Sequence, residues 1–243
     1  MIIYEPRGAA AEYSPLAANL YRGCSHGCRY CYAPSCLRMH RSDFDRAVPR
    51  KNVLEELAKD AVSFAGDPRP VLLSFTSDPY QPIEEHKHLT RGAIALLARH
   101  NIKIRLLTKG AVLAMRDIDL FVRCGVEVGV TLCWGDDAKR LAWEPASSSI
   151  SARIALLKEA KLRGLKTWVS VEPVIEPAEG IAAIRLAGPW ADTIKIGKLN
   201  HHKDIEADVD WRAFRDEAQL LAESFGGSVY IKDDLRKAAG CSA

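Results

Sequence analysis

The chain has 243 residues, 48% of them apolar, with a formal net charge of +3 and ordinary contents of glycine and proline. This length can bury one sizeable core, and the composition excludes a fibrous or disordered chain. No apolar run approaches the ~18 residues of a membrane span, and the mild positive charge permits an anionic partner without requiring one.

The predicted elements begin with a strand over residues 17–23, which leads into a cysteine-rich segment. A helix follows over residues 49–66, where apolar residues recur at helical spacing. Short apolar runs then alternate with longer stretches of helical spacing, and glycine or polar residues separate them. The predicted strands are 71–75, 102–110, 126–132, 165–171, 192–197 and 228–231, and the predicted helices are 89–100, 111–125, 149–164, 176–188 and 210–226.

This alternation predicts parallel strands joined by right-handed crossovers. Six such units favour an α/β fold of the partial (β/α)6 barrel type, with the helices outside. We predict a single domain over residues 1–243, with a cysteine loop at 22–36, a core barrel over about 17–200 and a C-terminal helix and tail over 201–243. In such barrels functional residues gather where the strands end.

Thiols are concentrated in the stretch LYRGCSHGCRYCYAPSC, residues 20–36, which holds four of the seven cysteines. Cys24, Cys28 and Cys31 form a C-x3-C-x2-C spacing, and Cys36 follows. An odd number of clustered cysteines argues against a secreted disulfide framework, and the N-terminus lacks the apolar core of an export signal. We therefore expect a cytoplasmic location and cysteines that act as ligands.

Several chemistries could use these thiols. A zinc site would need a fourth ligand, for which Cys36 and His26 are candidates. A redox pair could use Cys28 and Cys31, but such a pair needs no third cysteine. Buried free thiols fit poorly with the polar residues between them. Iron–sulfur chemistry fits better, because thiolates ligate four-iron clusters and three of them leave one iron open.

Further stretches accompany this spacing along the chain. After YRGCSHGCRYCYAP come SFTSDPYQPIE, LLTKG, WEPASSSISAR and VEPVI, in that order. Together with six βα units they resemble the radical SAM superfamily, and more narrowly its spore photoproduct lyase-like branch, also described as DNA repair photolyase-like. The resemblance runs from about Leu20 to Leu199.

The resemblance implies an enzyme with two cofactors. Cys24, Cys28 and Cys31 match the ligands of a [4Fe-4S] cluster whose fourth iron binds S-adenosylmethionine. Reductive cleavage of that molecule would release a 5′-deoxyadenosyl radical, which abstracts hydrogen from a substrate. The cofactors carry the hard chemistry, and the protein binds and orients them. An external one-electron reductant of the flavodoxin or ferredoxin type is implied as a partner.

The resemblance also marks residues at strand ends as contacts of S-adenosylmethionine. Ser77 and Asp78 follow the second barrel strand, Lys109 follows the third, and Thr131 ends the fourth. A lysine there suits the carboxylate of the cofactor on charge grounds alone. Each has a simpler explanation, since Ser77 and Asp78 precede a proline and could stabilise a turn, and Thr131 could be an ordinary strand residue.

One position departs from the lyase pattern. Lyases of this branch carry a hydrogen-donating cysteine directly before the threonine of the TSD stretch, and here that position is Phe75. A phenyl ring cannot return a hydrogen atom, so Phe75 argues against the full lyase cycle. Tyr30 and Tyr32 match tyrosines of a radical relay, although they could also pack around the cluster. Cys133, at the end of the fourth predicted strand, is our candidate for a thiol that replaces the cysteine of the lyases from a different strand of the barrel.

The substrate is less defined. A nucleic-acid lesion or a modified base is our first hypothesis, by analogy with the family. A peptide or small-molecule substrate is the second, and a non-catalytic zinc or iron–sulfur interaction module is the third. Residues 38–51 form a weakly basic loop. Glu172, directly after a predicted strand, puts a carboxylate at the barrel mouth or serves a turn. The residues after the last core strand could face an anionic substrate or coat a loop: Lys195, Lys198, Asn200, His201 and His202.

Overall fold

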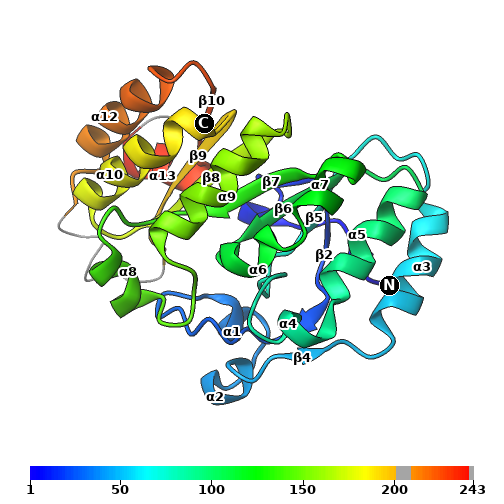
Figure 1. Ribbon diagram of the computed structural model, residues 1–243. Coiled ribbons are helices and arrows are strands. Elements are labelled where there is room, and N and C mark those ends of the chain that lie inside the picture. Colours follow the sequence, from blue (N-terminus) through cyan, green and yellow to red (C-terminus); the bar gives the residue numbers. More distant parts are fainter. Residues whose placement is uncertain (201–208, 241–243) are drawn as a thin grey trace.

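An eight-stranded sheet forms the centre of the computed structural model, which describes residues 1–200 and 209–240 (Figure 1). The strand order is β1-β2-β5-β6-β7-β8-β9-β10, and every neighbouring pair is parallel except β1 with β2. The strands are β1 (Ile3–Tyr4), β2 (Leu16–Ala18), β5 (Val71–Leu73), β6 (Ile104–Thr108), β7 (Glu127–Thr131), β8 (Thr167–Val174), β9 (Thr193–Lys198) and β10 (Ser228–Ile231).

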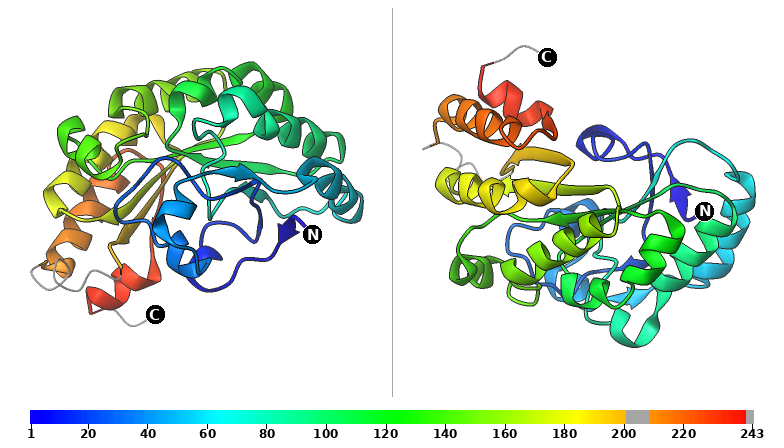
Figure 2. Two further views of the ribbon diagram at one scale, coloured as in Figure 1. Left: turned by 90° about the horizontal axis from the view of Figure 1, so that it is seen from below. Right: turned by 45° about the horizontal axis from the view of Figure 1, so that its top comes forward.

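Helices cover the outer face of this sheet, and Figure 2 shows the N-terminal region on its concave side. The outer layer includes α3, α5, α7, α9, α10 and α12, and neighbours in this series pack on one another or on the strands beneath them. The helices are α1 (Ala33–Cys36), α2 (Arg41–Phe44), α3 (Val53–Ser63), α4 (Glu84–Lys87), α5 (Leu89–Arg99), α6 (Ala111–Met115), α7 (Ile118–Cys124), α8 (Asp137–Trp143), α9 (Ile150–Leu162), α10 (Pro177–Ala187), α12 (Trp211–Glu223) and α13 (Asp233–Ala238).

The predicted fold class is confirmed. Strands β2 and β5 to β9 are the six predicted barrel strands, and they follow one another in the sheet in sequence order. Consecutive crossovers of one hand produce such an order. β10 extends the series beyond the six units, pairing in parallel with β9 through Ser228 opposite Thr193.

Two predicted elements differ from the structure. The predicted helix over 111–125 is two helices, α6 and α7, separated at Asp117. Asp117 is fully buried there and binds the guanidinium groups of Arg91 and Arg116 and the hydroxyl of Tyr80. The predicted strand over 17–23 is also divided, into β2 and the short strand β3 (Tyr21–Arg22), which pairs with β4 (Val48–Pro49) in a separate ribbon.

The segment before β2 closes the concave side of the sheet. The Tyr13 hydroxyl lies 2.8 Å from Oγ of Ser170 in β8 and also donates to the carboxylate of Glu172. Nζ of Lys195 in β9 donates to the carbonyl of Glu12 at 2.6 Å. These bonds tie the start of the chain to strands that form more than 150 residues later.

Lys195 is buried in this closure, and its pKa makes stability depend on pH. Burial, reinforced by the charge of Arg105, lowers the pKa of Lys195 to about 8, whereas an exposed lysine titrates near ~10.4. Between these values the unfolded chain binds the extra proton, so the free energy of unfolding rises with pH in that window. We expect this rise, of about 3 kcal/mol at most, to be absent from Lys195→Met in urea unfolding at pH 7 to 10.5. Parallel curves for the two proteins would contradict the assignment.

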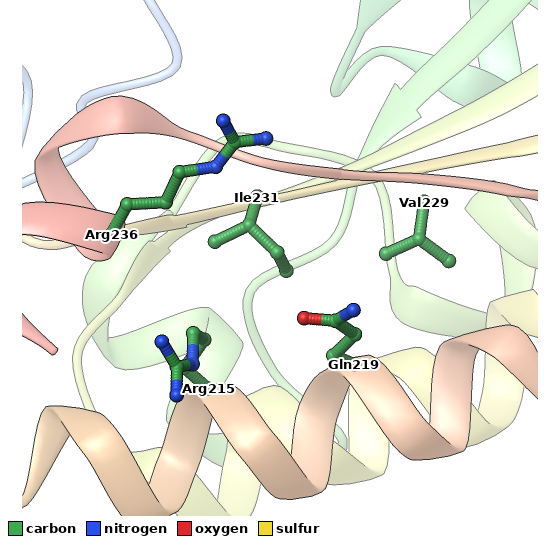
Figure 3. Close-up of a pocket in the computed structure, with 5 residues that line it drawn as sticks. All are labelled: Arg215, Gln219, Val229, Ile231 and Arg236. Atoms are coloured by element: carbon green, nitrogen blue, oxygen red, sulfur yellow. The ribbon is translucent and has the colours of Figure 1, made fainter. Parts of the chain in front are cut away.

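A cavity of about 290 Å³ lies between α12 and β10 (Figure 3). Arg215 and Gln219 reach into it from α12, Val229 and Ile231 line it from β10, and Arg236 comes from α13. In Figure 1 the region of α12 and β10 lies apart from α1 and the cysteine loop. Among the described residues, no helix is long and apolar enough to cross a membrane.

Candidate functional site

The cysteine loop runs from β3 to α1 and lies at the edge of the sheet where the parallel strands end. Gly23 has a φ of +82° and Gly27 a φ of +69°, values that glycine adopts readily. A Cβ at Gly23 would also collide with the carbonyl of Phe44. The Cys24 amide donates to that same carbonyl at 2.8 Å, and the Cys31 amide donates to the carbonyl of Cys28 at 3.2 Å. The two glycines therefore let the loop that carries the three cysteines turn tightly.

Segments from other strand ends anchor this loop. The Ser25 amide donates to Oε1 of the fully buried Gln81 at 3.0 Å. The Arg29 amide donates to the carbonyl of Trp143 at 2.9 Å, and Nδ1 of His26 lies 2.9 Å from the carbonyl of Ala146. The loop is thus held from two sides, by the segment after β5 and by the segment after α8.

The three candidate ligand thiols influence one another electrostatically. Burial raises the pKa of Cys24 to about 12, and the neighbouring charges of Asp78 and Cys28 add to this. Burial also raises the pKa of Cys28 to about 12, with Cys31 contributing, while the ammonium of Lys109 opposes the rise. Lys109 likewise favours the thiolate of Cys31. Bound iron stabilises thiolates much more strongly, because a coordinating thiol is deprotonated outright.

These residues fit an iron–sulfur cluster better than a zinc ion. The donors are three cysteines in one loop, and thiolates are the protein ligands of iron–sulfur clusters. Cys36 is exposed on α1, and the ring nitrogens of His26 face Ala146 and Asp78. Of the two candidates for a fourth zinc ligand, His26 is thus engaged with other groups of the chain.

Asp78 joins three of the segments that surround the loop. Its Oδ1 accepts from the Tyr80 amide at 2.8 Å and the Thr108 hydroxyl at 2.6 Å, and its Oδ2 accepts from the Lys109 amide at 2.6 Å. Nε2 of His26 lies 3.3 Å from Oδ2, a charge contact without the alignment of a hydrogen bond. Burial opposes the ionised form, but His26 and these donors hold the pKa of Asp78 at about 2. Both oxygens are thus engaged within the chain.

The other residues expected to contact S-adenosylmethionine lie at the same edge. Ser77 is buried, and its Oγ lies 3.3 Å from Oγ of Ser74. Thr131 ends β7, where its carbonyl accepts from Nη1 of Arg153 at 2.9 Å. Nζ of Lys109 lies 5.7 Å from the centre of the Tyr30 ring, within range of a cation–π contact. The fold brings these side chains to the edge that holds the cysteine loop, and their contact with the cofactor stays a prediction.

A buried ion pair lies behind the loop. Glu144 and Arg153 are both inaccessible to solvent and bind each other, and the Tyr30 hydroxyl donates to the same carboxylate. Burial disfavours the ionised Glu144, but Arg153 and Lys109 hold its pKa below the usual range. The Tyr30 hydroxyl also lies 3.9 Å from Sγ of Cys133, which is buried at the end of β7. Tyr30 therefore connects the cysteine loop to the Cys133 thiol.

Tyr32 and Phe75 face the concave side of the sheet. The side chain of Tyr32 is 47% exposed. Partial burial and the charges of Cys31 and Glu172 raise the pKa of its phenol. Phe75 packs edge-on against Tyr13, with ring centres 5.8 Å apart. Position 75 thus presents a phenyl ring in place of the cysteine of the lyases.

The residues after the last barrel strands have mainly internal partners. Glu172 accepts from Nζ of Lys232 at 2.9 Å, and Lys195 holds the segment before β2. Nζ of Lys198 donates to the carbonyl of Leu199 at 2.8 Å, and Asn200 binds Asp234. His201 and His202 lie outside the described residues.

Three residues of this site have roles that the sequence analysis did not assign, Gln81 and the Glu144–Arg153 pair, which hold the loop. His26, considered there as a zinc ligand, instead anchors the loop to Ala146. A signal for the pair was present, since Arg153 occupies an otherwise apolar helical face next to Ile150 and Leu157. A cavity of about 260 Å³ beside the loop is lined by His26, Tyr80, Pro82, Glu85, Gly110, Val112, Leu113, Ala146, Ser147 and Ser148.

A partial α/β barrel with three loop cysteines at its strand ends defines a class of cluster-binding proteins that act at a barrel mouth. The family model of the radical SAM superfamily matches residues 18–184 of this chain. The chain belongs to the radical SAM superfamily. Its cofactors are therefore a [4Fe-4S] cluster and S-adenosylmethionine.

Relatives from bacteria and archaea are similar over most of the chain. Uncharacterized proteins of Mycobacterium bovis and Mycobacterium tuberculosis are 34% identical over 179 residues, which cover 70% of this chain and 52% of theirs. An uncharacterized protein of Methanocaldococcus jannaschii is 32% identical over 159 residues, covering 65% of this chain and 59% of its own. The chain thus spans about half the length of the mycobacterial relatives it matches.

Solved structures of the same fold include spore photoproduct lyase complexed with its dinucleoside photoproduct. The TM-score is 0.69 at 15% identity, covering 93% of this chain and 78% of the lyase. SuiB of Streptococcus suis, bound to S-adenosylmethionine, has a TM-score of 0.65 at 10% identity, covering 91% of this chain and 51% of SuiB. At these identities the likeness concerns the fold.

Proposed function

We propose that this chain is a radical SAM enzyme whose cluster is held by Cys24, Cys28 and Cys31, and that it abstracts hydrogen from a nucleic-acid lesion or a modified base. The observation that carries the proposal is the position of the three thiols. They share one loop at the carboxyl edge of the parallel strands, and the ammonium of Lys109 acts electrostatically on Cys28 and Cys31. When bound, the cluster and S-adenosylmethionine supply a 5′-deoxyadenosyl radical to the barrel mouth.

Residues of the chain then have distinct tasks. Cys24, Cys28 and Cys31 would hold three irons, while Lys109 provides a fixed positive charge for the carboxylate of the cofactor. A carboxylate oxygen of Asp78 accepts a hydrogen bond from the Lys109 amide and so fixes the turn that carries the Lys109 side chain. Ser77 offers a buried hydroxyl, and Thr131 lies at the end of β7. The buried walls of the barrel mouth exclude water from the radical.

Cys133 is our candidate for the thiol that returns a hydrogen atom, with Tyr30 as its neighbour in the relay. Sγ of Cys133 and the hydroxyl of Tyr30 are 3.9 Å apart, and the phenyl ring of Phe75 has no hydrogen to give. We expect Cys133→Ala to lose product formation while 5′-deoxyadenosine formation continues, because the variant keeps the ligand cysteines. Cys124→Ala, which removes a thiol from α7, is the matched control. Full product yield from Cys133→Ala would remove Cys133 from the mechanism.

The nucleic-acid assignment draws on one comparison. Spore photoproduct lyase, a protein of the same fold, binds a dinucleoside photoproduct.

The proposal is tested by anaerobic reconstitution with iron and sulfide, followed by reduction in the presence of S-adenosylmethionine. We expect 5′-deoxyadenosine, with a higher yield when irradiated oligonucleotides are added and no increase with an equal mass of mixed peptides. Deuterium transfer from labelled oligonucleotide into 5′-deoxyadenosine would identify the abstracted hydrogen. Absence of 5′-deoxyadenosine from protein with four irons and four sulfides would overturn the proposal, and stimulation by peptides alone would overturn its substrate.

A further inference from the structure

The segment that holds the cysteines carries a net positive charge. Residues 22–51 contain seven Arg or Lys and two Asp, a net charge of +5. These cations lie within the stretch that runs from β3 to the start of α3.

Most of these cations are free to meet a partner. Arg41 pairs with Asp45, but six other cations in the segment are exposed, and no ion pair among the described residues involves them. They are Arg22, Arg29, Arg38, Arg46, Arg50 and Lys51. Asp43 is the only exposed acid in residues 22–51. Surface cations without acidic neighbours create a field that steers anionic partners.

Apolar side chains lie among these cations. Tyr32 is 47% exposed, Leu37 37% and Val48 50%. Val48 of β4 is paired directly with Arg22 of β3, so an aliphatic group and a guanidinium lie side by side on one small ribbon. We name the exposed cations of residues 22–51, together with the three exposed apolar or aromatic side chains among them, the basic face. It comprises Arg22, Arg29, Tyr32, Leu37, Arg38, Arg46, Val48, Arg50 and Lys51.

We infer that the basic face is the docking surface for the electron donor, a small acidic redox protein of the flavodoxin or ferredoxin type. The inference rests on the proposed cluster at Cys24, Cys28 and Cys31. Radical SAM enzymes need a reductant, and electron transfer weakens steeply with distance. The Cys24 amide donates to the carbonyl of Phe44 at 2.8 Å, two residues before Arg46, so a protein docked on the basic face lies next to the cysteine loop.

The mixed character of the face favours a protein over a nucleic acid. Arginine and aromatic residues are enriched in protein interfaces, where apolar side chains form the centre and charges the rim. A phosphate backbone would instead be matched by cations alone, and Leu37 and Val48 would lie unused beneath it. In the electron transfer, fully reduced flavodoxin loses one electron, and the oxidised cluster gains it.

The test compares two reductants on reconstituted enzyme. The triple variant Arg22→Glu, Arg46→Glu, Arg50→Glu reverses three exposed cations of the basic face and leaves every cysteine in place. The control variant Lys103→Glu, Arg123→Glu, Lys166→Glu makes the same charge change at exposed positions near the opposite ends of the strands. Cluster reduction is followed by stopped-flow absorbance, first with photoreduced 5-deazaflavin and then with fully reduced flavodoxin.

We expect deazaflavin to reduce wild type and both variants at similar rates. Flavodoxin should reduce the basic-face variant about tenfold more slowly at low salt, and the control at the wild-type rate. Added salt should slow the wild type and not the variant. The neutral variant Arg22→Gln, Arg46→Gln, Arg50→Gln should fall between them, which separates steering from misfolding.

Three outcomes would overturn the inference. Equal flavodoxin rates would show that the donor docks elsewhere, with the cluster and the proposed function intact. Slower reduction by both reductants would show that the substitutions act on the cluster itself. Loss of oligonucleotide binding with an unchanged flavodoxin rate would assign the face to nucleic acid. If deazaflavin finds no reducible cluster in the wild type, the proposed function fails first and this inference with it.

Discussion

Replacement of Cys28 by alanine is expected to abolish 5′-deoxyadenosine formation, with a loss of at least ~1,000-fold. Cys28 is the middle cysteine of the loop and is electrostatically coupled to both Cys24 and Cys31. Its removal leaves two thiols, which cannot hold three corners of a cube. The radical then has no source, because electron entry and cofactor binding both depend on the cluster.

The measurement combines iron and sulfide content with the yield of 5′-deoxyadenosine after anaerobic reconstitution. Cys36→Ala is the matched control, because Cys36 lies only eight positions along the chain but is exposed on α1. We expect this variant to keep its cluster and its activity. A Cys28→Ala protein that retains four irons and forms 5′-deoxyadenosine would refute the ligand assignment, and so would a Cys36→Ala protein that has lost both.

The second large effect concerns the buried pair behind the loop. Arg153→Met should lower the free energy of unfolding by about 3–5 kcal/mol, because it leaves the Glu144 carboxylate buried without its partner. Arg153 also donates to the carbonyls of Thr131 at 2.9 Å and Ser148 at 3.0 Å, so these acceptors lose their donors as well. Urea unfolding at pH 7 measures the loss.

Two further variants separate charge burial from packing. The double variant Glu144→Gln, Arg153→Met removes the uncompensated charge, so we expect it to recover part of the lost stability. Arg163, directly after α9, forms surface ion pairs with Glu159 and Asp119. Arg163→Met breaks both pairs, and the free energy of unfolding should fall by less than about 1 kcal/mol. Equal losses for Arg153→Met and Arg163→Met would mean that the buried pair has no special role.

Much of the architecture could be predicted from local patterns. Short apolar runs become buried strands when both faces of a parallel sheet are covered, as with Val71–Leu73 of β5. The predicted helix over 149–164 is α9, Ile150–Leu162, where Ser149 accepts from the Ala152 amide. The predicted helix over 111–125 failed because Asp117 is needed inside the fold. Helical spacing cannot reveal an aspartate whose partners come from another helix.

The candidate site too could be predicted in part from local patterns, while the rest depends on contacts between distant residues. The spacing of Cys24, Cys28 and Cys31 is local, so it could be read along the chain. Gln81 and the Glu144–Arg153 pair are known only from contacts, since their partners lie 56 and 9 positions away. Asp78 illustrates both cases. Its position after a predicted strand made it a candidate site residue, but its hydrogen bonds with Tyr80, Thr108 and Lys109 are known only from the structure.

The sequence by itself determined the order of strands and helices, the three-cysteine spacing and the family, because each depends on neighbours within a few turns or residues. The tertiary structure decided which polar groups meet. It joined Tyr30 to Cys133 and Glu144 and placed the start of the chain against β8 and β9. The physical reason is that hydrogen bonds and charge pairs act over a few ångströms in space, whatever the separation along the chain.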